Sequence, residues 1–200
     1  AHATATPPKS TLPFRTLADA LYSQYISDKK NSAGDVRRKK GLYVGSIPLY
    51  GYQRDKEGFL TPDEETKGIV QRIYREYLSG TGLTELARKL NGEGIPSPKQ
   101  HKIYKGLLRG EKKKSFEGKN CFWLPTTLHQ ILRNETYTGV LSSGAYKSGP
   151  LGSGKRVFAP EEERVRVENA HPAIIDKDIF KEVQEKMHTK KRGEEKQFLL

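Results

Sequence analysis

Three segments between residues 61 and 137 repeat apolar residues at the spacing of an α-helix, and this pattern constrains the fold most. The first segment opens with Thr61-Pro62-Asp63-Glu64. This predicts a helix start in which Thr61 and Glu64 cap each other and Pro62 takes the first helical position. The apolar sides of the three segments are Ile69, Val70, Ile73, Tyr74, Tyr77 and Leu78, then Leu83, Leu86, Ala87 and Leu90, then Leu124, Leu128, Ile131 and Leu132. Two helices joined by a Gly-containing turn predict the front half of a helix-turn-helix.

The third predicted helix has a polar side that suits DNA recognition. At about 100° per residue, the side opposite its apolar residues carries Thr126, His129, Gln130 and Arg133, with Thr127 and Asn134 at the flank. These side chains are donors and acceptors of the size that reads base edges in a major groove. A helix face in contact with water is also polar, so this helix alone leaves both interpretations open.

The charge of the chain narrows the choice of partner. Its 36 Lys and Arg residues exceed its 24 Asp and Glu residues, which gives a formal net charge of +12. This excess favours a polyanionic partner, most often nucleic acid, although ribosomal or anionic-membrane binding also fits the charge alone. No run approaches the roughly 18 apolar residues of a membrane span, and an N-terminal signal peptide is not recognisable. We therefore expect double-stranded DNA as the partner, no membrane, and a cytoplasmic location.

A long helix and an irregular segment precede the three predicted helices. Apolar residues from Phe14 to Ile26 recur at helical spacing and predict a connecting helix over residues 14–40, stopped by Gly41. Residues 41–54 predict extended chain or a short strand, and we place Tyr52 among the residues that hold DNA. The helix ends in four cations that suit either its dipole or a DNA phosphate. These cations are Arg37, Arg38, Lys39 and Lys40.

Two further basic segments accompany the predicted third helix. Residues 99–119 form an insertion that is either a solvated loop or an arm that orders on phosphate, and it contains Lys112, Lys113 and Lys114. After residue 137, alternating charged and apolar residues predict a strand pair, the wing of a winged helix. The basic residues of the wing tip, Lys147, Lys155 and Arg156, are expected to face the phosphate backbone or a minor groove.

No catalytic arrangement is recognisable in the sequence. The five histidines are scattered, and the single cysteine, Cys121, excludes an internal disulfide and cannot alone form a zinc site. We expect Trp123 to be part of the core and His171 to be a structural residue rather than a base. The sequence therefore predicts no catalytic residue, no metal and no cofactor in this chain, and a stand-alone hydrolase is the interpretation with least support.

Five stretches occur in an order that resembles one family: residues 25–29, 41–52, 82–96, 123–139 and 167–175. Over roughly residues 14–188 the chain resembles the recombinase domain of large serine recombinases, the phage integrases and mobile-element transposases that cut DNA with a serine. The resemblance implies a bacterial or phage protein with a resolvase-type catalytic domain before this region and a zinc ribbon after it. We therefore expect this chain to be a fragment, and we expect homo-oligomers only in the full-length parent. One departure is Leu124, where relatives often place a Ser or Thr cap.

Together these patterns predict a mainly α (α+β) fold, a winged-helix-like helix-turn-helix domain over residues 41–188 with a β-hairpin wing. A disordered tail over residues 1–13 and a linker over residues 189–200 are expected at the ends. A closing helix, capped by Asp176, is expected to point Ile179, Phe180, Val183 and Met187 inward. The expected function is sequence-specific binding of a recombination attachment half-site, as part of a serine site-specific recombinase in DNA integration or excision. The alternatives are a winged-helix transcription regulator and an RNA-binding protein.

Overall fold

A computed structural model describes residues 12–108, 119–143, 146–148, 156–158, 160, 162 and 164–197. The elements before the third predicted helix are α1 (Leu12–Lys39), β1 (Tyr52–Arg54), β2 (Leu60–Pro62), α2 (Lys67–Leu78), α3 (Leu83–Gly92) and α4 (Pro98–Tyr104). They are followed by α6 (Pro125–Leu132), the 3-10 helix η1 (Glu135–Thr138), β3 (Leu141–Ser143), β4 (Tyr146–Ser148), β5 (Arg156–Phe158), β6 (Val165–Val167) and α7 (Lys177–Gln197). Helices dominate and the strands form small antiparallel pairs, so the predicted α+β class is confirmed.

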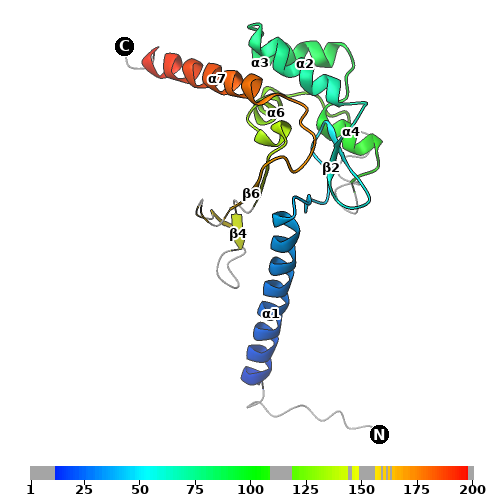
Figure 1. The fold of residues 1–200 in the computed structure, drawn as a ribbon, viewed down its shortest axis with the longest axis vertical. Helices are drawn as coiled ribbons and strands as arrows, with labels where there is room; N and C mark the ends of the chain where they lie inside the picture. The colour runs from blue at the N-terminus through cyan, green and yellow to red at the C-terminus, as the bar shows by residue number, and fades with distance from the viewer. Residues whose placement is uncertain are drawn as a thin grey trace.

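The core lies where α2, α3, α6 and α7 meet, in the upper part of Figure 1. Helix α2 contacts the other three helices, and α3 packs against α6. The predicted apolar sides are confirmed for the residues that these helices bury: Val70, Ile73, Tyr74, Tyr77, Leu86, Ala87, Leu90, Leu128, Ile131, Leu132 and Val183. Each large apolar side chain removed from water stabilises the fold by about 1.5–3 kcal/mol, so this cluster is what holds the helices together.

Tyrosine hydroxyl groups connect segments that are far apart in the sequence. The hydroxyl of Tyr74 donates to the Ile131 carbonyl at 3.0 Å, and that of Tyr137 donates to the Tyr50 carbonyl at 2.9 Å. A buried phenol needs such an acceptor because its polar group has lost water. Burial raises the pKa of Tyr74 and Tyr137 well above the ordinary value, so both remain neutral in the folded chain.

Helix α2 begins later than the sequence predicts. Thr61 lies in β2, where it pairs with Gln53, and the helix starts only at Lys67. The predicted cap between Thr61 and Glu64 is therefore wrong, because strand pairing overrides the local helix-start signal. Asp63 turns the chain instead. Its carboxylate accepts from the Glu65 N–H at 3.2 Å and from the Thr66 hydroxyl at 2.9 Å, and its carbonyl accepts from the Lys67 N–H at 2.8 Å.

Part of the predicted basic insertion is helical. Ser97 accepts a hydrogen bond from the Gln100 N–H at 3.2 Å, and Pro98 occupies the first turn, which together start α4. The sequence alone does not predict this helix, because its apolar residues are too few to show a periodic side. Lys112, Lys113 and Lys114 lie outside the described residues.

The strands after η1 form two antiparallel pairs. Leu141 pairs with Val167 in β3 and β6, and Lys147 pairs with Val157 in β4 and β5. The predicted strand pair is thus confirmed, while its turn, with Lys155, lies outside the described residues. In Figure 1 the strands β4 and β6 lie below the helical body, on the side from which α1 extends.

The closing helix α7 starts where predicted and continues further than predicted. The Phe180 N–H donates to the Asp176 carbonyl at 3.0 Å, and the helix extends to Gln197, through most of the segment expected as a linker. Phe180 and Met187 pack against the core beside buried Val183. Ile179, which was expected to point inward, is 37% exposed because it lies beside that apolar side of the helix and not within it.

Helix α1 leaves the body as a long arm, shown in blue in Figure 1. It ends at Lys39, and Gly41 follows two residues later with φ +76°, a conformation that favours glycine. The end of α1 contacts β6, and a Cβ on Gly41 would lie 3.3 Å from the Cβ of Ala170. The predicted helix over residues 14–40 is confirmed, with Leu21, Tyr22 and Tyr25 exposed along it. Among the described residues, no helix combines the length and apolar character needed to cross a membrane.

Candidate nucleic-acid interface

The start of α6 is fixed to the end of α3. Trp123 is 1% exposed, as expected for a core residue, and its indole N–H donates to the Ile95 carbonyl at 2.9 Å. The side chain of Asn91 binds the backbone of Trp123 twice. It accepts from the Trp123 N–H at 2.7 Å and donates to the Trp123 carbonyl at 3.0 Å. Pro125 then starts the helix, so the first turn of α6 directly follows the residue that Asn91 holds.

The outer side of α6 carries the four polar side chains predicted for it: Thr126, His129, Gln130 and Arg133. All four are exposed, while Leu128, Ile131 and Leu132 are buried on the opposite side against α2 and α3. None of the four has a hydrogen-bond or ion-pair partner among the residues that the structure describes. Their donors and acceptors are therefore available to a ligand, which is the arrangement that base recognition requires.

The two flanking residues of this side are less available. Thr127 is half-buried. The side-chain oxygen of Asn134 accepts from the Thr136 N–H at 3.0 Å and so starts η1. Asn134 therefore has a structural function in the turn after α6, and this hydrogen bond uses one of the two acceptor positions of that oxygen.

Tyr52 does not lie on the surface, which corrects its predicted contact with DNA. It is 3% exposed, its ring stacks on Tyr137, and its hydroxyl donates to the Pro172 carbonyl at 3.0 Å. Within strand β1, Tyr52 is buried in the core, while Gln53 and Arg54 are exposed. A hydroxyl enclosed by backbone carbonyls has no access to a phosphate.

His171 lies edge-on against Tyr52 and is structural, as expected from the sequence. The ring centroids are 4.9 Å apart, and the Nε2 atom of His171 is 2.7 Å from the Thr136 carbonyl. Its Nδ1 atom is buried without a hydrogen-bond partner among the described residues. Burial lowers the pKa of His171, and the hydrogen bond between its ring and the Thr136 carbonyl only partly offsets this effect. The neutral ring is therefore the form that the fold favours.

Two apolar side chains stand exposed directly before α6, and the sequence did not predict this. Leu124 was expected on the buried side of the helix, yet it is 56% exposed, and Phe122 is 66% exposed. The reason is that Leu124 precedes the helix in extended conformation, with φ −119° and ψ 147°. In extended chain successive side chains point to opposite sides, so the buried Trp123 turns both of its neighbours outward. The Trp-Leu-Pro sequence carries this signal, since Pro125 marks the first helical position.

The predicted phosphate contacts lie on separate elements. At the end of α1, Arg37, Lys39 and Lys40 are exposed, whereas Arg38 is 2.6 Å from the carboxylate of Asp35. Lys147 and Arg156 lie on the paired strands β4 and β5. The contact between α1 and β6 brings the first of these groups near the base of the hairpin. The end of α1 therefore lies beside the strand pair of β3 and β6.

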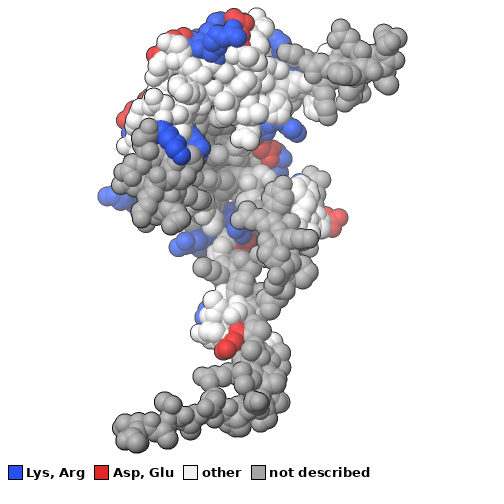
Figure 2. Space-filling view, turned by 180° about the vertical axis from the view of Figure 1, so that it is seen from behind, with Lys and Arg blue, Asp and Glu red and all other residues white. Residues whose placement is uncertain are grey.

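Positive charge on the body is interspersed with negative charge. Figure 2 shows Lys and Arg side chains in several places over the face that it presents, with Asp and Glu side chains among them. Arg72, for example, binds both Glu76 and Glu93 and so connects α2 to the residue after α3. Arg72 also lowers the pKa of Glu93. Cations held in this way stabilise the body, and they are less available to a phosphate.

One side-chain group in the described part of the chain has the composition of a metal site. Ligand atoms of Asp63, Glu65 and His101 lie within 4.8 Å of one another. The same atoms are already used, because Lys105 is 2.7 Å from the Glu65 carboxylate and Asp63 accepts from the Thr66 hydroxyl. This group is explained by the turn before α2 and by the docking of α4 against it.

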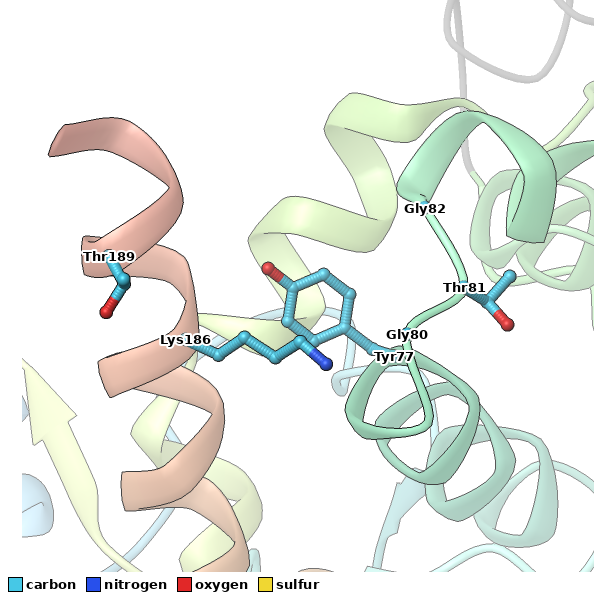
Figure 3. A pocket seen from close by; sticks show the side chains of 6 residues that line it. All are labelled: Tyr77, Gly80, Thr81, Gly82, Lys186 and Thr189. Carbon is cyan, nitrogen blue, oxygen red and sulfur yellow. The ribbon is translucent and has the colours of Figure 1, made fainter. Parts of the chain in front are cut away.

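A hollow of about 300 Å³ lies between α7 and the turn that joins α2 to α3. Figure 3 shows Lys186 reaching from α7 toward Tyr77 at the end of α2, with residues 80–82 to one side. The amine of Lys186 donates to the Leu78 carbonyl at 2.8 Å and lies 5.8 Å from the centre of the Tyr77 ring. Its charge thus stabilises the carboxyl end of α2, where helix carbonyl groups lack partners.

The family model described as Recombinase matches residues 64–190, which include α2, α3, α6 and most of α7. A solved structure titled "Crystal Structure of a LSR-DNA Complex" has 18% identity over 78% of this chain and 36% of that chain, with a TM-score of 0.49. Another, titled "Sequence Requirements of the Listeria innocua prophage attP site", has 18% identity over 78% of this chain and 50% of that chain, with a TM-score of 0.48. The chain therefore spans half or less of the length of these two proteins.

Proposed function

The chain belongs to the Recombinase family, and from this premise we propose that it binds one half of a recombination attachment site in double-stranded DNA. The outer side of α6 supports the proposal most directly. Thr126, His129, Gln130 and Arg133 are exposed together on one helix, and none has a partner among the described residues. We assign α6 as the recognition helix of a helix-turn-helix, with α3 as the helix that supports it.

The dimensions of α6 fit a short stretch of one groove. Thr126 and Arg133 are seven positions apart, which corresponds to about 10 Å along a helix. Base pairs in DNA rise by about 3.4 Å, so this side of α6 spans about three of them. Arginine is suited to guanine because its guanidinium can donate two parallel hydrogen bonds to the O6 and N7 atoms. We therefore assign Arg133 to a guanine and the other three residues to neighbouring base edges.

The basic groups outside α6 supply affinity that does not depend on sequence. We assign Arg37, Lys39 and Lys40 to phosphates beside the hairpin, because α1 ends against β6. We assign the same function, because of their charge, to Lys147 and Arg156 and to four residues outside the described part of the chain, Lys112, Lys113, Lys114 and Lys155. We further propose that this DNA binding serves site-specific recombination, in which a serine of a separate resolvase-type domain cuts the DNA.

The test compares specific with non-specific binding by two matched variants. The chain is first used to select duplexes from a randomised pool, and affinities are then measured for the selected duplex and for a random one. Arg133→Ala is expected to cost about 1–3 kcal/mol for the selected duplex only. Arg75→Ala removes the same charge from an exposed position on α2 and is expected to change neither affinity by more than a small amount.

One outcome contradicts the assignment of Arg133, and another contradicts DNA as the partner. Equal loss of affinity for both duplexes in the Arg133→Ala variant would assign that residue to the phosphate backbone. Tighter binding of structured RNA than of duplex DNA at the same salt concentration would replace DNA by RNA as the partner.

A further inference from the structure

Phe122 and Leu124 are exposed apolar side chains held at fixed positions. The backbone around them makes four hydrogen bonds to side chains. Asn91 accounts for two of these at Trp123, and the other two are at Cys121, whose carbonyl accepts from the Ser97 hydroxyl at 2.6 Å and whose N–H donates to the Gln100 side chain at 2.8 Å. An apolar side chain on a mobile loop can fold back onto the protein. Here the backbone is tied to α3 and α4, and both side chains are kept in water.

The position of this pair relative to α6 is set by the chain itself. Leu124 is the residue before the first helical position, and Thr126, the first exposed polar residue of α6, follows two residues later. The amino-terminal residues of a recognition helix are the ones that enter the major groove most deeply. An apolar pair immediately before this end would lie beside the groove that α6 enters.

We propose that Phe122 and Leu124 contact the methyl groups of thymines in that major groove, which gives the chain a preference for T·A base pairs at one end of its half-site. This inference rests on the proposed DNA binding by α6. The thymine methyl group is the one apolar group that a base pair presents in the major groove, and apolar side chains are its natural partner. The surroundings favour nucleic acid over an apolar protein surface, because Lys119, His129 and Arg133 are exposed on either side of the pair in the sequence.

The test removes single methyl groups from the DNA. A duplex selected from a randomised pool by the 200-residue chain is synthesised with each thymine replaced in turn by deoxyuridine, which differs only in the missing methyl group. Binding is measured by fluorescence anisotropy at one salt concentration. At one or two positions near one end of the half-site, the replacement is expected to weaken binding about fourfold, the effect of exposing one buried methyl group.

Two variants connect this effect to the proposed residues. Leu124→Ser supplies a side chain that caps helix starts, so α6 keeps its start while the apolar contact is lost. Phe122→Ser removes the ring from an exposed position. Each variant is expected to bind thymine and deoxyuridine duplexes equally well at its own position. Leu21→Ser changes a leucine of similar exposure, 63%, on α1 and is expected to keep the fourfold difference.

The possible failures are distinguishable. If the chain binds its selected duplex specifically and no thymine replacement weakens binding, the methyl contact is refuted and DNA recognition by α6 stands. A methyl effect that persists in both serine variants also refutes it, because other residues would then make the contact. If the pool yields no preferred duplex, the proposed function fails first, and the inference fails with it.

Discussion

Replacing Asn91 with alanine tests the link between α3 and α6, the helix that we propose reads DNA. The change removes two hydrogen bonds, of 2.7 and 3.0 Å, from the backbone of Trp123. Each is worth about 1 kcal/mol net, and stranding a backbone group next to the buried indole adds to the loss. Alanine is the better helix former by about 0.5 kcal/mol in the last turn of α3. The expected net destabilisation is therefore about 1.5–2.5 kcal/mol.

Thermal unfolding followed by circular dichroism measures this effect. For a chain of this size, 1 kcal/mol corresponds to a shift in Tm of about 2–4 °C, so we expect a decrease of about 3–10 °C. Asn120→Ala is the matched control, since Asn120 is exposed and its replacement should change stability by less than about 0.5 kcal/mol.

DNA binding provides the second readout. At a temperature where both proteins are folded, Asn91→Ala should weaken binding to the selected duplex more than binding to random DNA. The reason is that the first turn of α6 loses its fixed position while every cation is retained. A Tm within about 1 °C of the unsubstituted chain would refute the view that Asn91 holds α6 in place.

Three other substitutions test the remaining assignments. Tyr52→Phe should lower the free energy of unfolding by about 1 kcal/mol, because the Pro172 carbonyl loses its donor. The same change should leave DNA affinity unchanged. Weaker DNA binding at unchanged stability would show that Tyr52 contacts DNA. Burial lowers the pKa of His171, so the stability from its neutral form is complete above the unfolded pKa of about 6.5 and is lost as pH falls toward the folded value. His171→Gln should therefore lose less stability between about pH 7.5 and 5.5 than the unsubstituted chain, and equal losses in urea titrations would contradict this. Replacing Lys112, Lys113 and Lys114 together by glutamine should weaken binding to all duplexes. The salt dependence of the affinity should decrease by an amount that corresponds to up to about three phosphate contacts. An unchanged salt dependence would show that this segment does not contact the phosphates.

The helical core could be predicted from the sequence because its apolar residues recur at helical spacing. Val70, Ile73 and Leu128 occupy positions that recur at helical spacing, and their burial follows from that spacing wherever the helices pack together. The start of α2 could not be predicted in this way. Thr61 carries a valid local signal for a helix start, but it pairs with Gln53, and such pairing is a tertiary contact that local patterns do not contain.

In the candidate site, too, some positions could be predicted from the sequence and others could not. The exposure of Thr126, His129, Gln130 and Arg133 followed from helical geometry alone. Helical spacing does not predict the exposure of Leu124, because this residue precedes the helix and its extended conformation changes the direction of the side chain. Tyr52 was misplaced for a different reason. Its neighbours include polar and charged residues, and only the fold shows that its own position faces inward.

The joint at Gly41 has a mechanical consequence. Helix α1 has 28 residues, which corresponds to a length of about 42 Å. A change of about 10° in its direction at the joint would move its far end by about 7 Å over that length. A side chain at Gly41 would meet Ala170 and would also oppose the positive φ, so the direction of the helix is sensitive to this one residue. Any group joined to the far end of α1 therefore has its position relative to the helical body set by this glycine.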